Sequence, residues 1–259
     1  MASTYRWNLR TYECGADGCA TLPALLDLMQ ESASLNAAEL GFSKTDFEAR
    51  GENASWVLTR MKTRIMRYPR WGEEIALATW PRGGRKITAY RDFEAVSAAT
   101  GERLAIATSE WMMLDLAARK VLRIPDAVFA AADTERGCVF GEEGFAHLKW
   151  GEGTDGRTAL QCGREGTGAF RAGRSQIDLN GHVNNVHYVR WMLDATPEAF
   201  AATREIAECE VVFKSETFAG EDVVAEVAAI GEGEMLHRVR TVDGASDHAL
   251  ARTVWRAKT

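Results

Sequence analysis

Three side chains able to transfer a proton or to donate a hydrogen bond stand close together in the chain: Asp178, Asn180 and His182. A second carboxylate, Glu216, follows in the stretch FKSETFAGE. Attack on a thioester carbonyl needs a base or a nucleophile, and it needs donors that hold the oxyanion. A carboxylate can serve as base or nucleophile, while an amide and an imidazole can orient water or donate to the carbonyl oxygen. The four residues together fit thioester hydrolysis.

The element that follows these residues is a predicted helix. The run VHYVRWML has apolar residues at helical spacing, and Asn184 or Asn185 is a candidate N-cap ahead of it. The first turn of a helix carries unpaired backbone N–H groups and the positive end of the helix dipole, which suit developing negative charge. Each polar residue also has a plain structural interpretation: Asp178 in a turn, His182 on the surface, Glu216 at an exposed strand end.

The order of predicted elements repeats along the chain. A helix is expected over residues 22–40, because apolar residues between Leu22 and Met29 fall on one helical face. A turn is expected at 81–84, and a second helix over 185–195. Runs rich in β-branched and aromatic residues predict strands over residues 56–67, 73–80, 86–96 and 103–114, then over 209–215, 222–230, 235–242 and 248–258.

A duplicated unit explains this order, and in each copy we expect a curved antiparallel sheet wrapped around one central helix, an α+β fold. The hinge between the first two strands of each copy supports the duplication, since WGEEI at 71–75 matches AGEDV at 219–223. The expected organisation is an N-terminal domain over residues 1–135, a connector rich in Gly, Ala and acidic residues over 136–168, and a C-terminal domain over 169–259.

The alignment of the two copies bears on the polar residues. It places Asp178, Asn180 and His182 opposite Ala16, Gly18 and Ala20, and it places Glu216 opposite Tyr68. A cap that the fold requires should occur in both copies, whereas a site that is used once need not. The alignment therefore favours a single active site in the second copy.

Composition limits the class of protein. The chain has 259 residues and a net charge of −6, which disfavours nucleic acid as a partner. No run approaches the roughly 18 apolar residues of a membrane span, and the start lacks the apolar core of a signal peptide, so a cytoplasmic protein is expected. The cysteines have no metal-type spacing and are expected to be reduced: Cys14, Cys19, Cys138, Cys162 and Cys209.

An acidic partner would have to meet a local basic patch. Two stretches offer one, and the alternative for both is an ordinary solvated surface. The candidate residues are Arg82, Arg85 and Lys86 in RGGRK, and Arg171 and Arg174 in FRAGRSQ.

Four stretches, in order along the chain, carry a resemblance to a known family. They are RTYECGADGCATLPALLDLMQESA, WVLTRMKTRIMRYPRWGEEIALATW, the segment from GERLAIATSEWMMLD through RKVLRIPDAV, and DLNGHVNNVHYVRWMLDA. Over nearly its whole length the chain resembles the acyl-acyl carrier protein thioesterases of plants and bacteria. The resemblance implies a tandem hot-dog fold, release of a free fatty acid from acyl carrier protein, and no metal or organic cofactor.

The resemblance also implies roles for residues. The family's motif acid, amide and histidine fall on Asp178, Asn180 and His182, and its later glutamate falls on Glu216. A cysteine that follows this glutamate in the family is Thr217 here, which argues against a cysteine nucleophile. Two routes stay open: the glutamate activates water, or the aspartate attacks directly and forms a short-lived anhydride.

The first domain would hold the acyl chain, as in the family. Its expected lining is the apolar face of the 22–40 helix with Met61, Ile65 and Trp111, and the alternative is that these residues are simply core.

Three other functions are compatible with parts of the pattern. A hot-dog acyl-coenzyme A thioesterase would use the same chemistry on another carrier. A dehydratase or hydratase acts on the β-carbon, which the Asp-x-Asn-x-His arrangement with a later Glu fits poorly. A non-catalytic acyl-binding module would use the polar residues only as a cap. The sequence leaves open the acyl chain length and whether the protein is a monomer or a homodimer.

Overall fold

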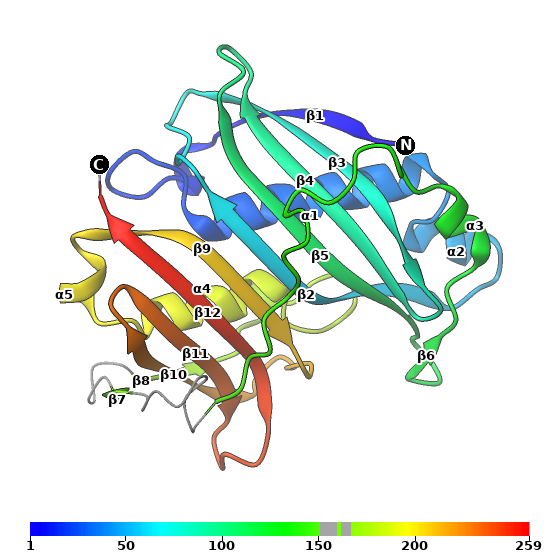
Figure 1. The fold of residues 1–259 in the computed structure, drawn as a ribbon. Helices are drawn as coiled ribbons and strands as arrows, with labels where there is room; N and C mark the ends of the chain where they lie inside the picture. The colour runs from blue at the N-terminus through cyan, green and yellow to red at the C-terminus, as the bar shows by residue number, and fades with distance from the viewer. Residues whose placement is uncertain (151–159, 162–166, 259) are drawn as a thin grey trace. The chain divides into compact units, whose positions relative to one another are not determined.

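The computed structural model of the protein describes residues 1–150, 160–161 and 167–258 (Figure 1). The chain divides into two compact parts, Met1–Gly144 and Phe145–Thr259, which we call the N-terminal unit and the C-terminal unit. Cys162 and part of the expected connector lie outside the described residues.

The N-terminal unit is an antiparallel sheet with one long helix, α1 (Leu22–Glu39), packed against strand β3 (Figure 1). Its strands lie in the order β1-β3-β4-β5-β2, and β6 pairs with β5. The strands are β1 (Ser3–Asn8), β2 (Ala54–Ile65), β3 (Glu74–Arg85), β4 (Thr88–Ser97), β5 (Arg103–Asp115) and β6 (Lys120–Leu122). The short helices are a 3-10 turn (Thr11–Glu13), α2 (Lys44–Ala49) and α3 (Asp126–Ala130).

Local sequence sets the ends of α1. The Thr21 side chain accepts a hydrogen bond from the Ala24 N–H at 3.2 Å, so it caps the first turn, in which Pro23 has no N–H that would need an acceptor. Gly41, just after the helix, has a φ of +77°, the left-handed conformation that ends many helices. Met29 is fully buried on the face that meets the sheet. The expected helix is confirmed.

The turn expected at 81–84 is wrong. β3 continues to Arg85 and β4 begins at Thr88, so the chain reverses between these residues. A β-bulge interrupts the pairing of β3 with β4 at the predicted turn. A Cβ at Gly84 would lie 2.1 Å from the Thr88 carbonyl oxygen, so glycine there permits a close approach of two strands rather than a turn.

The C-terminal unit repeats this architecture with a shorter helix, α4 (Asn185–Asp194), packed against β10 and β11. The strand order is β9-β12-β11-β10, and both β7 and β8 pair with β10. The strands are β7 (Leu160–Gln161), β8 (Thr167–Arg171), β9 (Arg204–Phe213), β10 (Asp222–Gly231), β11 (Glu234–Thr241) and β12 (Asp247–Ala257). A 3-10 turn (Arg174–Gln176) precedes α4, and α5 (Glu198–Ala201) follows it.

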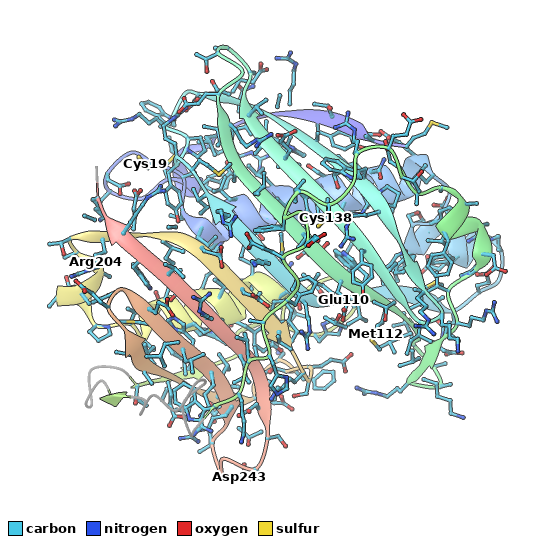
Figure 2. The ribbon with its side chains drawn as sticks, viewed as in Figure 1. Cys19, Glu110, Met112, Cys138, Arg204 and Asp243 are labelled. Carbon is cyan, nitrogen blue, oxygen red and sulfur yellow. The ribbon has the colours of Figure 1, made fainter. Side chains whose placement is uncertain are left out.

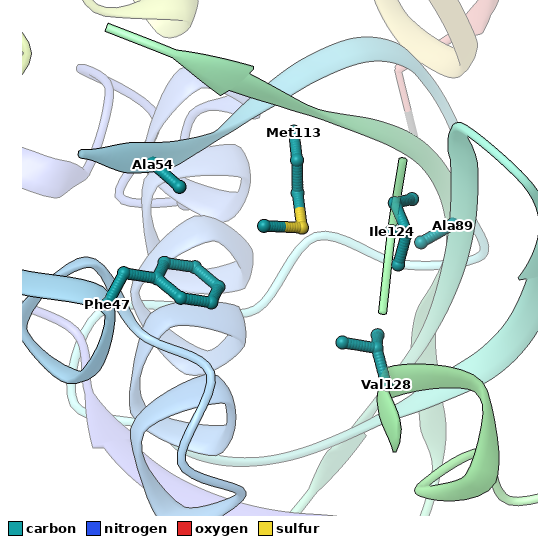
Figure 3. Close-up of a cluster of buried hydrophobic side chains, with 6 residues drawn as sticks. All are labelled: Phe47, Ala54, Ala89, Met113, Ile124 and Val128. Atoms are coloured by element: carbon teal, nitrogen blue, oxygen red, sulfur yellow. The ribbon is translucent and has the colours of Figure 1, made fainter. Parts of the chain in front are cut away.

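Each unit has an additional apolar cluster within itself. In the N-terminal unit, α2 and α3 close over the strands through Phe47, Ala54, Ala89, Met113, Ile124 and Val128 (Figure 3). In the C-terminal unit, Leu148 packs with Ile230, Leu236 and Leu250. The residues just after the division between the units therefore belong to the core of the second.

No disulfide joins the cysteines within the described residues, which are Cys14, Cys19, Cys138 and Cys209. Cys19 lies in the loop ahead of α1, and Cys138 lies in the segment after α3 (Figure 2). None of the helices in the described ranges has the length and apolar character of a membrane span.

Candidate active site

A tight loop directly ahead of α4 carries the polar residues of the motif. Ile177 and Val183 form an isolated antiparallel bridge, and inside it the Asp178 N–H donates to the His182 carbonyl at 2.9 Å. Gly181 sits at the reversal with a φ of +86°, which a side chain would disfavour. The loop closes on itself, so residues four apart in the sequence lie side by side.

The His182 imidazole lies between two carboxylates. Its Nδ1 is 3.8 Å from Asp178 Oδ1, and its Nε2 is 3.7 Å from Glu216 Oε1. The exposed fractions of the three side chains are 16%, 19% and 29% for His182, Asp178 and Glu216, so all of them are accessible from solvent. Both separations exceed a hydrogen bond, and such contacts often tighten only when a substrate binds.

Backbone hydrogen bonds bring Glu216 to the loop. The residue follows β9, in a segment without regular structure. The Val183 N–H donates to the Thr217 carbonyl at 2.8 Å, which ties this segment to the loop. Asn180 lies half-buried in the same loop, and its N–H donates to Asp178 Oδ1 at 2.8 Å. The structure thus brings all four predicted residues together within the C-terminal unit.

The loop leads straight into the helix. Asn184 is the N-cap, since its Oδ1 accepts from the Val186 N–H at 3.0 Å. Of the two asparagines considered as caps, Asn184 is therefore confirmed. The first turn of α4 begins beside the histidine, where its N–H groups and dipole favour an anion.

The N-terminal unit contains the same loop, and it corrects the expected alignment by one residue. The Gly15 N–H donates to the Cys19 carbonyl at 2.8 Å, which matches the bond from Asp178 to His182. The true counterparts of Asp178, Asn180 and His182 are therefore Gly15, Asp17 and Cys19. The expected alignment was one residue out because the two loops share too few residue types to fix their register, whereas the equal spacing from loop to helix cap in the two units does fix it.

The other expected alignments hold. The Ala20 N–H donates to the Pro69 carbonyl at 2.8 Å, as Val183 does to Thr217, so Glu216 does lie opposite Tyr68. At the hinge, Gly72 and Gly220 share a φ above +80°. The first copy lacks the imidazole and the second carboxylate. Its single acid there, Asp17, accepts a hydrogen bond from the Cys19 N–H at 3.0 Å and so stabilises the turn.

Neither Thr217 nor the nearest cysteine in the sequence, Cys209, is accessible for a cysteine mechanism. Thr217 has no exposed surface, and Cys209 lies buried within β9, where burial raises the pKa of its thiol to about 12. A thiol with so high a pKa is a poor nucleophile at neutral pH. β9 begins at Arg204, earlier than the strand predicted from Cys209.

Sequence patterns did not predict a layer of polar side chains behind Glu216. Ser215, Tyr188 and His248 hydrogen-bond or pack against one another there. The signal that could have found them is the duplication, because the residues opposite Tyr188 and His248 in the N-terminal unit are leucines.

The basic residues proposed for docking differ in their local pairing. Arg82 pairs with Asp92 at 3.2 Å, and Arg171 pairs with Asp222 at 3.1 Å. The remaining three are exposed, and within the described ranges no carboxylate pairs with them: Arg85, Lys86 and Arg174. Arg174 begins the 3-10 turn whose last residue, Gln176, accepts a hydrogen bond from the Asn184 N–H at 2.9 Å.

The N-terminal unit contains an apolar cavity. Trp56 and Trp111 from the sheet line it together with Ala33 and Ala37 of α1. Trp111 therefore lines a cavity as expected, whereas Met61 and Ile65 are buried and are not among its lining residues. Among the residues that the structure describes, no group of three or more His, Cys, Asp and Glu side chains is arranged to hold a metal.

Comparison with protein families identifies both halves of the chain. The model described as the acyl-ACP thioesterase N-terminal domain matches residues 2–132, and that of the acyl-ACP thioesterase C-terminal domain matches residues 164–257. A palmitoyl-acyl carrier protein thioesterase of Gossypium hirsutum is 30% identical and is matched by the whole chain, which spans 64% of the length of that relative. An oleoyl-acyl carrier protein thioesterase of Arabidopsis thaliana is 27% identical over 97% of this chain and 76% of its own length.

Solved structures agree on the fold. An acyl-ACP thioesterase from Bacteroides thetaiotaomicron superposes with a TM-score of 0.83 at 21% identity, covering 98% of each chain. A 12:0-ACP thioesterase from Umbellularia californica superposes with a TM-score of 0.80 at 23% identity, covering 99% of this chain and 98% of the other. The tandem hot-dog fold is confirmed, and the chain belongs to the acyl-acyl carrier protein thioesterase family.

Proposed function

We propose that the protein hydrolyses the thioester of a fatty acyl-acyl carrier protein and releases the free fatty acid. The observation that carries the proposal is the His182 imidazole between Asp178 and Glu216 at the start of α4. Membership of the family supports it, and so do the names of the relatives, which are acyl carrier protein thioesterases.

Two routes through this site are chemically balanced. In the first, Glu216 takes a proton from water as the water oxygen bonds to the thioester carbon, and the proton passes to the departing thiolate when the C–S bond breaks. In the second, an Asp178 oxygen bonds to the carbonyl carbon, the thiolate leaves and is protonated, and water then hydrolyses the anhydride. In both, His182 and Asn180 orient the reacting groups, and N–H donors at the helix start stabilise the oxyanion.

A single turnover in water labelled with ¹⁸O detects an anhydride that is hydrolysed at the Asp178 carbonyl. Direct attack by water places ¹⁸O in the fatty acid on the first turnover. An anhydride that is hydrolysed at the Asp178 carbonyl instead gives unlabelled acid on that turnover, and the label appears in the protein.

The acyl chain is proposed to occupy the cavity of the N-terminal unit. The lining is apolar at Trp56 and Trp111, as a hydrocarbon chain requires. Replacement of Ala37 by Phe would narrow the cavity, and we expect it to shift release toward shorter acids in a panel of thioesters.

The carrier is proposed to dock on the five basic residues already named. Arg174 has the best support, because it is exposed and stands just ahead of the site loop. An acidic carrier would be attracted there by charge. The oligomeric state, monomer or homodimer, stays a proposal that sedimentation analysis tests, and the cytoplasmic location stays one that cell fractionation tests.

The test of the function is release of free acid from acyl carrier protein thioesters of several chain lengths, beside the matching coenzyme A thioesters. Turnover on the carrier protein thioesters that is lost in Asp178→Ala supports the proposal. Higher kcat/KM on coenzyme A thioesters would instead identify the protein as an acyl-coenzyme A thioesterase. Tight binding of acyl carriers without release would favour the non-catalytic binding module.

A further inference from the structure

Ser215, the residue before Glu216, is a junction of hydrogen bonds. Its hydroxyl donates to the Asp247 carbonyl at 3.3 Å and lies 3.0 Å from His248 Nδ1. Its carbonyl accepts from the Tyr188 hydroxyl at 3.5 Å. Two elements, α4 and the start of β12, therefore contact Ser215, the residue directly before the site glutamate.

The histidine is held by contacts on its ring. A serine hydroxyl both donates and accepts, so Ser215 Oγ can bond the Asp247 carbonyl at 3.3 Å and His248 Nδ1 at 3.0 Å. The tautomer of His248 decides which atom of the Ser215–His248 pair donates. His248 is only 7% exposed, and its ring lies 6.4 Å from the Tyr188 ring. The imidazole is thus held in one orientation behind the glutamate segment.

A β-bulge aims His248 at the site. Val239 of β11 faces Ala249 of β12, but the next residue, Arg240, faces Asp247, which leaves His248 as the extra residue. Bulges re-aim side chains and occur often beside active sites. The His248 carbonyl also accepts from the Ser215 N–H at 3.3 Å, so main chain and side chain both hold the same serine.

The N-terminal unit has the same bulge without the polar groups. There Leu104 is the extra residue, between Arg103 opposite Val96 and Ala105 opposite Ala95. The Leu104 carbonyl accepts from the Arg67 N–H at 3.2 Å, as His248 does from Ser215. Leu104 is fully buried, and so is Leu25, the counterpart of Tyr188. The bulge belongs to the fold, whereas the imidazole, the serine and the phenol occur only in the unit that carries the glutamate.

We propose that Ser215 and His248, with Tyr188, are positioning residues that hold the Glu216 carboxylate toward His182. The proposal rests on the proposed function in that Glu216 serves the thioesterase reaction. None of the three side chains reaches the reacting atoms. They act through the backbone of Ser215, which sets where the next side chain points.

The test compares Ser215→Ala and His248→Leu with the wild-type full chain on an acyl carrier protein thioester. Leucine is the residue that the same bulge accommodates in the N-terminal unit. We expect kcat to fall on the order of 10- to 100-fold, since a misplacement of about 1 Å can have that effect, while KM changes less than about threefold. Because the two residues act as one unit, the double variant should be no slower than the slower single variant.

Two further variants separate positioning from general stability. His248→Asn keeps an N–H donor for Ser215 and should recover part of kcat. His237 is another buried imidazole of the same sheet, hydrogen-bonded to Thr253 at 2.7 Å. His237→Phe removes it and introduces the residue found at the equivalent position of the N-terminal unit, Phe93. It should leave kcat within about twofold. Equal losses in His237→Phe and His248→Leu would overturn the proposal.

Crystal structures of Ser215→Ala and His248→Leu supply a readout that does not depend on turnover. The proposal predicts that the Glu216 carboxylate moves away from its position 3.7 Å from His182 Nε2. An unmoved carboxylate would overturn the positioning proposal, whether or not the wild type has thioesterase activity. Absence of thioesterase activity in the wild type would by itself defeat only the proposed function. Wild-type kcat in both variants, with Glu216→Gln inactive, would overturn the positioning role alone.

Discussion

Residues 15–21 and residues 178–184 form two loops with the same backbone and different chemistry. Each closes by a bond between residues four apart, at 2.8 Å and 2.9 Å, and each reverses at a glycine with positive φ. The first reads GADGCAT and the second DLNGHVN. The duplicated scaffold therefore sets the geometry, and we propose that substitutions in one copy supply the reactive groups. The first copy is an internal control for the second.

The largest expected effect comes from removal of the carboxylates. Asp178→Ala and Glu216→Ala should each lower kcat by about 100- to 10,000-fold, the range over which a positioned acid or base contributes. Both should fold, because Gly15 and Tyr68 occupy these positions in the other unit. The measurements are steady-state release of fatty acid and a thermal melt. Near-wild-type turnover in Asp178→Ala would defeat the assignment.

Conversion of the histidine to its counterpart should have a similar but smaller effect. His182→Cys introduces the residue found at Cys19, and we expect kcat to fall about 100-fold while the melting temperature stays close to that of the wild type. The converse change, Cys19→His, should create no second activity because no carboxylate replaces Tyr68. Unchanged turnover in His182→Cys would remove the imidazole from the mechanism.

Acid should destabilise the C-terminal unit through His237. Burial lowers the pKa of this histidine from 6.5 to about 4. Between these values the unfolded chain binds a proton that the folded unit does not bind, so stability falls as pH drops from 6.5 to 4. The loss amounts to about 3 kcal/mol. Hydrogen exchange in β11 and β12 should show it, and His237→Phe should flatten the pH dependence.

The two loop glycines offer a matched pair of smaller changes. Gly18→Ala and Gly181→Ala place a side chain at φ values of +73° and +86°, and no neighbour would contact the new Cβ in either. Each should lose about 1–2 kcal/mol of unfolding free energy from the left-handed conformation. Only Gly181→Ala should also lower kcat. A similar kcat loss in Gly18→Ala would show that the first loop takes part in the reaction.

The smallest expected effect is a change in KM that follows from replacing an exposed basic residue. Arg174→Thr introduces the counterpart residue, Thr11, and should raise KM for the carrier protein thioester a few fold without changing kcat. The effect should shrink as salt is raised, and it should be absent with a short pantetheine thioester. An equal rise in KM on that small substrate would place Arg174 at the acyl or thioester site instead of the docking face.

Sequence patterns were sufficient for the helices and the duplication, and less so for the details that position side chains. Apolar periodicity and the Thr21 cap predicted α1, and the paired hinges predicted the second copy. The PRGG stretch was misjudged because glycine also serves close approach of strands, which only the neighbouring strand reveals. Residue types were sufficient to select a candidate acid, amide, histidine and glutamate that lie together in the structure, but the loop alignment was one residue out. His248 could not be found, because a β-bulge depends on pairing across strands.

An exchange of one loop for the other tests the central claim most directly. A chain in which residues 178–184 carry GADGCAT in place of DLNGHVN keeps the loop length and the backbone hydrogen bonds of the first copy. Release of fatty acid from acyl carrier protein thioesters is then measured beside the melting temperature. We expect a folded protein whose release falls to the background rate. A folded exchange variant that still releases fatty acid at a rate near that of the wild type would contradict the central claim.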